Sequence, residues 1–176
     1  MKKNSFFRWP GELGFSLMEL MVCIAILLII LTLSVPSFQA TLNNNRLSVT
    51  VNDFYASLNL ARAEGIRRGS RVNMAPLTGT DWTSGWTIFV DANNNNVLDD
   101  GEERIMAHGA VPKGLTISMT MSPSSTSFGF DSAGRGTAKG NWIFSLNDDL
   151  QRKISINFFG RPRICNPVTD TSCKTD

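Results

Sequence analysis

The chain has 176 residues, of which 17 are lysine or arginine and 15 are aspartate or glutamate, for a net charge of +2. This length suits one folded domain with an appendage, and a hydrophobic content of 42% is ordinary for a globular protein. A single histidine, His108, excludes any site that needs two. No nucleophile elbow, phosphate loop, Cys-x-x-Cys pair or histidine-rich metal pattern is present, so we expect neither an enzyme nor a cofactor.

The first element expected is a long apolar helix. From Phe15 to Val35 the only charged residue in 21 positions is Glu19. At about 1.5 Å of rise per residue this helix is roughly 31 Å long, the thickness of a bilayer core. Three basic residues and one acid precede it: Lys2, Lys3, Arg8 and Glu12. This basic excess predicts a single membrane span with a cytoplasmic amino terminus and an exported carboxyl-terminal part.

One acid inside an apolar helix needs an explanation. Glu19 is either a charge tolerated because it reaches the interface or a charge with a partner. The stretch "GELGFSLMEL", after a basic leader and before an apolar helix ending near Pro36, resembles the amino terminus of type IV prepilins and of type II secretion pseudopilins. The resemblance implies that a prepilin peptidase cleaves between Gly14 and Phe15 and methylates the new amino group. It also implies that Glu19 serves assembly by pairing with the terminal charge of a neighbouring subunit, since two such charges are tolerated in an apolar bundle when they meet.

The expected organisation follows from this reading. We expect a leader over residues 1–14, a membrane-spanning and filament-core helix over 15–36, an amphipathic continuation over 37–68, and a globular β domain over 69–176. Pro36 should kink or loosen the helix. In the continuation, hydrophobic residues recur at spacings of three and four and share one face: Leu47, Val51, Phe54, Leu58 and Ala61. Removal of the leader leaves 14 basic and 14 acidic residues, so overall charge identifies no partner.

Beyond Gly69 the pattern changes to short β segments separated by turn residues. They cover residues 71–75, 86–90, 104–107, 115–121, 126–130, 141–146 and 152–159. Near-strict alternation in "LTISMTM" and "RKISINF" predicts antiparallel strands with one wet face. The sequence therefore predicts an α+β, pilin-like fold, in which a long amino-terminal helix packs on an antiparallel sheet.

The exported part resembles one branch of this superfamily, the type IV minor pilins of the FimT/FimU type within the GspH/FimT family. The resemblance is carried by "ARAEGIRRGSRV", "GWTIFVDANNNNVLDDGEERI", "FDSAGRG" and "ISINFFGRPRIC". It implies a scarce subunit that sits near the filament tip or primes assembly, with other pilins and minor pilins as partners. Such a chain would lie in the bacterial inner membrane with a periplasmic domain, and later at the pilus tip, outside the cell.

The stretch "GRPRIC" is the strongest candidate for a separate activity. Pro162 favours an extended backbone, which places Arg161 and Arg163 on one side, roughly 6.5 Å apart. In FimT-type minor pilins a terminal Gly-Arg-x-Arg pattern is associated with DNA binding during uptake for natural transformation, and Gly160, Arg161 and Arg163 match it. Alternatively, the arginines only keep a final turn soluble, or they form ion pairs with acids of the loop from Asp91 to Glu103.

Further basic residues lie in the same terminal region: Arg152, Lys153 and Lys174. Contacts from such residues go chiefly to phosphates, so binding to double-stranded DNA should be weak, salt-sensitive and indifferent to sequence. Aromatic stacking could add single-strand binding, but alternation predicts that either Phe158 or Phe159 faces the core. The competing hypothesis is that the chain is a FimU-like priming subunit or a GspH-like pseudopilin that binds no DNA.

Two smaller patterns complete the sequence. Cys165 and Cys173 lie in the exported region, where oxidation is permitted, and predict a disulfide loop rather than two free thiols. In "DANNNNVLDDGE" an EF-hand spacing is met at positions one, three, five and twelve: Asp91, Asn93, Asn95 and Glu102. Asn96 stands where glycine is required and the flanks read as strands, so a polar hairpin explains the loop without calcium.

Overall fold

The structure is a computed structural model that describes residues 14–147 and 150–174. The chain divides into two compact units, residues 1–41 and residues 42–176. Helix α1 (Leu17–Arg68) begins in the first unit and ends in the second, and it continues through Pro36. Most of the expected leader, residues 1–13, lies outside the described residues.

The first unit contributes the amino-terminal part of α1. Ser16 caps the helix, because its Oγ accepts a hydrogen bond from the backbone N–H of Glu19 at 3.2 Å. Side chains from residue 14 to residue 31 are all exposed, including Glu19. Over the part of the chain that the structure describes, no helix is long and apolar enough to cross a membrane. The expected membrane span over residues 15–36 is therefore not confirmed.

The second unit is organised around the carboxyl-terminal part of α1. The predicted hydrophobic face is confirmed, since all five of its residues are at most 2% exposed: Leu47, Val51, Phe54, Leu58 and Ala61. Phe54 is the centre of the core. Its ring lies 5.0 Å from Trp86 of one sheet and 5.2 Å from Phe144 of the other, both edge to face. α1 ends at Arg68, directly before Gly69, as predicted.

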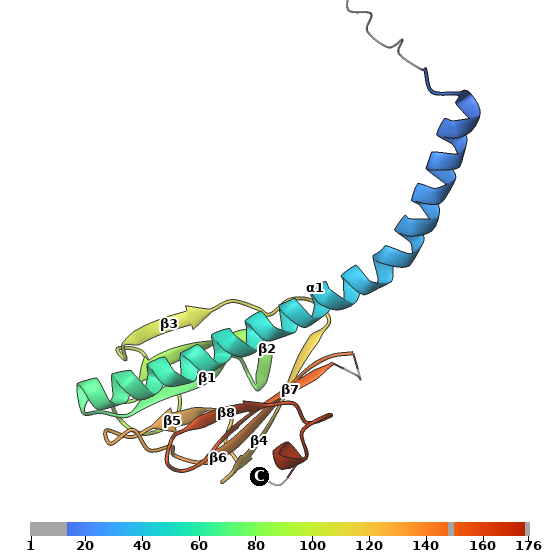
Figure 1. Cartoon of the computed structure of the whole chain (residues 1–176). Coiled ribbons are helices and arrows are strands. Elements are labelled where there is room, and N and C mark those ends of the chain that lie inside the picture. The colour runs from blue at the N-terminus through green and yellow to red at the C-terminus, as the bar shows by residue number, and fades with distance from the viewer. Residues whose placement is uncertain (1–13, 148–149, 175–176) are drawn as a thin grey trace, which may run out of the picture. The chain divides into compact units, whose positions relative to one another are not determined.

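Eight strands and one short 3-10 helix follow α1 in the described residues (Figure 1). They are β1 (Val72–Thr78), β2 (Asp81–Val90), β3 (Arg104–His108), β4 (Leu115–Ser122), β5 (Phe128–Phe130), β6 (Lys139–Leu146), β7 (Gln151–Ile156), β8 (Pro162–Cys165) and η1 (Thr171–Lys174). The α+β class with a long helix on antiparallel strands is confirmed.

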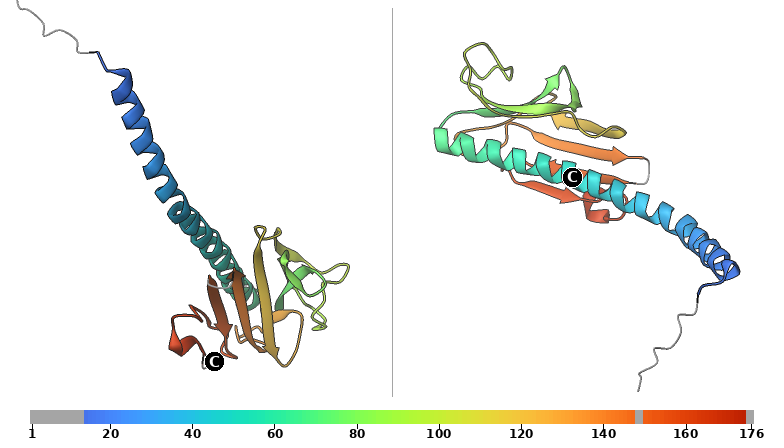
Figure 2. Two further views of the ribbon diagram at one scale, coloured as in Figure 1. Left: turned by 90° about the vertical axis from the view of Figure 1, so that its right-hand side faces the viewer. Right: turned by 90° about the horizontal axis from the view of Figure 1, so that it is seen from above.

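The strands form two sheets rather than one. The first has the order β3-β2-β1-β5 and the second the order β4-β6-β7-β8. All pairings within them are antiparallel. Two views of the ribbon show the two sheets beside the second half of α1 (Figure 2). The helix covers both, which explains why one hydrophobic stripe suffices to seal the core.

The last strands differ from the sequence-based expectation. β7 ends at Ile156, so residues 157–159 lie in a turn and not in a strand. The chain then reverses and adds β8 to the edge of the second sheet, pairing Ser155 with Arg163 and Ile156 with Pro162. Proline fits this edge position because its missing N–H is not needed by a further strand. This reversal determines where the terminal arginines lie.

Candidate nucleic-acid interface

The second sheet has a polar outer face that carries one of the two predicted arginines. Asn141 pairs with Ser155, and Ser155 pairs with Arg163, so the three residues form one row across β6, β7 and β8. Their sequence neighbours Trp142 and Ile154 are fully buried in the core. Because side chains alternate along a strand, the row of three lies on the opposite, outer face.

A groove lies over this row, which we call the arginine groove. Its volume is about 630 Å³, and it is lined by Lys139, Asn141, Ser155, Ile156, Asn157, Arg161, Pro162 and Arg163. Three of these residues are cationic, and no acid is among the described residues that line the groove. Arg161 and Arg163 are both exposed. The predicted arginine pair is therefore brought together on one surface, with Lys139 as a third positive charge.

The two arginines of the groove differ in their contacts with the rest of the chain. Arg163 donates from Nη2 to the carbonyl oxygen of Ser172 at 3.1 Å, which anchors it to the tail. Hydrogen bonds from Ser172 lower the pKa of Asp170 below its usual range, and the nearby charge of Arg163 contributes. Arg161 has no hydrogen bond or ion pair with any residue that the structure describes. It is the cation most available to an anionic ligand.

Gly160 has a steric role in this arrangement. Its φ is +69°, and a Cβ atom there would lie 2.3 Å from the carbonyl oxygen of Gly134. Gly134 in turn has a φ of +73° and packs against Ile66, and its carbonyl accepts a hydrogen bond from Arg62 Nε at 2.9 Å. Gly160 thus allows backbone contact between the turn before β8 and the loop after β5, and Gly134 allows side chains of α1 to approach that loop. Gly160 positions Arg161 and has no side chain to offer a ligand.

The turn over residues 157–160, here called the aromatic turn, presents two phenylalanines to solvent. Phe158 is 46% exposed and Phe159 is 72% exposed. The expectation that one of them faces the core is wrong, because strand alternation stops at Ile156. The turn is closed by a hydrogen bond from Gly160 N to Asn157 O at 2.9 Å. Lys139 Nζ lies 5.8 Å from the centre of the Phe158 ring.

The other predicted DNA contacts lie elsewhere. Arg152 is half-buried and donates to the carbonyl oxygen of Gln151 and to Asn44 Oδ1 on α1. Lys153 is buried, and its Nζ donates to the carbonyl oxygen of Cys173 at 2.9 Å. Its ammonium is therefore engaged by the tail rather than presented on the surface. The side chain of residue 174 lies outside the described residues.

The predicted disulfide is confirmed. Cys165 and Cys173 are bonded, with their Cα atoms 5.8 Å apart. The bridge closes the tail onto the end of β8, which brings the carbonyl oxygens of Ser172 and Cys173 within reach of Arg163 and Lys153. The disulfide thus supports the outer face of the second sheet next to the arginine groove.

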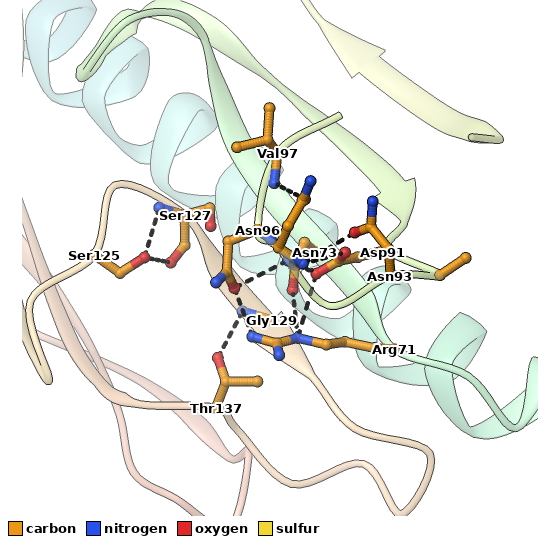
Figure 3. A network of polar contacts seen from close by, with 12 residues as sticks. Arg71, Asn73, Asp91, Asn93, Asn96, Val97, Ser125, Ser127, Gly129 and Thr137 are labelled. Carbon is orange, nitrogen blue, oxygen red and sulfur yellow. Dashed lines mark hydrogen bonds and ion pairs between the residues drawn. The ribbon is translucent and has the colours of Figure 1, made fainter. Parts of the chain in front are cut away.

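The loop over residues 91–102 is here called the polar loop. Its side-chain oxygen atoms accept hydrogen bonds from the loop itself and from neighbouring residues (Figure 3). Asp91 is 1% exposed. Its carboxylate accepts hydrogen bonds from Asn73 Nδ2 at 2.6 Å and from the backbone N–H of Asn95 and Asn96, and it lies 3.5 Å from Arg71 Nε.

The other EF-hand candidates are also engaged within this loop. Asn93 and Asn95 accept backbone N–H groups, and Glu102 accepts the N–H of Ala92. Asn96 has a φ of +69°, as its position required. No group of three or more histidine, cysteine or acidic side chains is arranged for a metal ion in the described part of the chain.

Glu103, the acid directly after the polar loop, pairs with the end of α1 and not with the terminal arginines. Glu103 binds Arg68 through both carboxylate oxygens, and Glu64 binds Arg67 and Arg68. Hydrogen bonds from Arg67 and Arg68 lower the pKa of Glu64 to about 2. A hydrogen bond from Arg68 lowers the pKa of Glu103 as well. These pairs use Arg67 and Arg68 at the end of α1.

Lys139 is the groove residue that the sequence did not suggest. It lies 22 positions before Arg161 and next to no other basic residue. Its place follows from the register of β6 against β7, where the neighbouring Gly140 pairs with Ile156. The alternation in residues 139–146 could have placed it on the outer face, but nothing in the sequence indicates which strand lies beside it.

Comparison with known proteins identifies related chains and folds. The prokaryotic N-terminal methylation motif matches residues 9–35. The pilin-like protein PilA1 of Thermus thermophilus is 34% identical over 92 residues, which cover 51% of this chain and 55% of that protein. The chain thus spans about half the length of this relative.

Solved structures share the fold. The type IV minor pilin FimU of Pseudomonas aeruginosa superposes with a TM-score of 0.58 at 22% identity, over 73% of this chain and 96% of that chain. The minor pseudopilin EpsH of the Vibrio cholerae type 2 secretion system gives a TM-score of 0.54 at 15% identity, over 69% and 98%. These neighbours are pilins and pseudopilins, not enzymes. Since the family described as type II transport protein GspH matches residues 50–160, the chain belongs to that family of minor pilins and pseudopilins.

Proposed function

We propose that this chain is a minor pilin of a type IV pilus that binds DNA through the arginine groove during uptake for natural transformation. The observation that carries the proposal is the convergence of Lys139, Arg161 and Arg163 on one polar groove without an acid among its described lining residues. Guanidinium and ammonium groups arranged in this way suit a row of phosphates.

In this proposal, the amino-terminal part of the chain is responsible for assembly into the filament. Residues 15–36 anchor the chain in the inner membrane before assembly, and a prepilin peptidase cleaves between Gly14 and Phe15 and methylates the new amino group. Glu19, exposed on α1, then pairs with the amino-terminal charge of a neighbouring pilin. Mass spectrometry of the chain isolated from pili should find a first residue of N-methylated Phe15. A first residue upstream of Gly14 would contradict this processing.

Contacts in the groove would be with the backbone of the nucleic acid. None of the lining residues belongs to a helix that could enter a major groove, so direct reading of base pairs is not supported. Affinity for duplex DNA should depend steeply on salt, because each phosphate contact releases counterions. It should not depend on sequence.

The test is a titration of labelled duplex DNA with the full chain in a mild detergent, which the exposed apolar side chains of α1 require. The double variant Arg161→Ala/Arg163→Ala should bind far more weakly, and its salt slope should fall by about 2. Arg104→Ala is the matched control, since it removes an exposed arginine from β3.

Two outcomes would count against the proposal. Equal DNA binding by the double variant and the wild type would show that the arginine groove does not contribute to DNA binding. No binding by the wild type would favour a tip-priming subunit or a type II secretion pseudopilin without a nucleic-acid role.

A further inference from the structure

The aromatic turn next to the arginine groove has no role in the proposed contacts with phosphates. Within residues 42–147 and 150–173, Phe158 and Phe159 are the only exposed aromatic residues. The other large rings of this unit are in the core, including all three of its tryptophans: Trp82, Trp86 and Trp142. These two adjacent rings lie in water beside the arginine groove, and they form a surface that hydrophobic burial does not explain.

The aromatic turn is held in place by its backbone, so the exposure of its rings is not the result of a loose loop. Phe158 O accepts a hydrogen bond from Gly136 N at 3.0 Å, and Phe159 N donates to Asn157 Oδ1 at 3.1 Å. Arg62 Nη2 reaches Phe159 O at 3.5 Å from α1. These bonds fix the backbone on both sides of each ring. The rings are therefore presented in a preorganised way, which lowers the entropy cost of contact with a ligand.

The positions of the cations complete the arrangement. Lys139 both lines the arginine groove and lies over the Phe158 ring, which joins the aromatic turn to the groove. Arg161 follows Phe159 by two residues and comes directly after the aromatic turn. A ring beside a row of cations is the combination used for single-stranded nucleic acid, where bases stack on aromatic side chains while cations hold the phosphates.

Resting on the proposed function, we infer that this site takes single-stranded DNA in preference to duplex DNA, with a base stacked on Phe159 and the backbone in the arginine groove. In a duplex the faces of the bases are already stacked on one another and cannot meet a phenylalanine ring. Phe159 is the stacking residue because its ring is the more exposed of the two, whereas Phe158 has Lys139 above it.

Three ligands of one length, about 12 nucleotides, separate stacking from charge. They are a labelled thymidine strand, an abasic strand with the same phosphates, and a duplex. The full chain in detergent should bind the thymidine strand about fivefold or more tightly than the abasic strand, the least that one stacked base contributes. Phe159→Ala should abolish this difference and leave abasic and duplex binding unchanged.

Two variants make the result specific to the ring. Phe159→Trp should keep or increase the preference, and its fluorescence should fall on addition of the thymidine strand but not of the abasic strand. Phe38→Ala removes an exposed phenylalanine from the first unit and should change nothing.

The possible failures can be told apart. If the wild type binds thymidine and abasic strands equally, and Phe159→Ala has no effect, the inference is overturned. If duplex binding is then still lost in Arg161→Ala/Arg163→Ala, the proposed function stands without it. If the wild type binds none of the three ligands, both the inference and the proposed function are overturned.

Discussion

The polar loop and the aromatic turn both connect strands at the surface, yet their side chains are used in opposite ways. In the polar loop, side-chain oxygens of Asp91, Asn93 and Asn95 accept hydrogen bonds from backbone N–H groups of the same loop. In the aromatic turn, the backbone contacts other parts of the unit, and the side chains of Phe158 and Phe159 are exposed to solvent. A segment stabilised through its backbone keeps its side chains available for a ligand.

The largest effect should come from breaking the closed network of the polar loop. Asp91→Ala leaves Arg71, Asn73 and two backbone N–H groups without their buried acceptor. The free energy of unfolding should fall by about 3 kcal/mol, measured by urea denaturation. The exposed Asp100 in the same loop is the control, and Asp100→Ala should cost little. Equal stability of both variants would contradict a structural role for Asp91.

The next largest effect concerns the tail that supports the arginine groove. Cys165→Ser/Cys173→Ser opens a small loop and should lower the free energy of unfolding by roughly 2 to 3 kcal/mol. DNA affinity should fall as well, because Ser172 O no longer holds Arg163 in place. The exposed Cys23 gives the control, since Cys23→Ser leaves this bridge intact. An unchanged thermal midpoint in the double variant would show that the tail contributes nothing.

A smaller effect on stability, with a clear effect on binding, should come from the aromatic turn. Gly160→Ala places a Cβ against Gly134 O and requires a left-handed backbone, so we expect a loss of about 2 kcal/mol. The displaced turn should also weaken DNA binding while the protein remains folded. Gly109→Ala is the control, because a Cβ there meets no atom within 4 Å. Normal DNA binding by Gly160→Ala would contradict a positioning role.

The smallest effect should come from the ion pairs at the end of α1. The pKa of Glu64 in the folded chain is about 2, below the ordinary value of 4.5, because Arg67 and Arg68 donate hydrogen bonds to it. Its contribution to stability is therefore present above about pH 4.5 and is lost as the pH falls towards 2. Solvent exposure and salt keep this contribution small. Urea midpoints of wild type and Glu64→Gln should differ at pH 6, and the difference should shrink as the pH falls from 4.5 towards 2. A constant difference would contradict the link to Glu64.

The sequence predicted what depends on local periodicity and missed what depends on sheet register. The buried stripe of α1, from Leu47 to Ala61, followed from its helical spacing alone. The approach of Lys139 to Arg161 and Arg163 required the order β6-β7-β8, which no local pattern contains. Strand alternation correctly places Lys153 on the same outer face as Ser155. The tail nevertheless covers Lys153, because alternation does not show which later segment packs on that face.

The contact between Gly134 and Gly160 also bears on how chains of this family vary. A side chain at Gly160 would meet the backbone of Gly134, and a side chain at Gly134 would meet Ile66 and Arg62, so both glycines are needed at this contact although they are 26 positions apart in the sequence. Across related chains, replacement of one should therefore accompany replacement of the other, together with the loss of an arginine at the place of Arg62. A related chain that has a terminal Gly-Arg-x-Arg sequence but no glycine at the place of Gly134 should therefore lack the contact that orients the arginines.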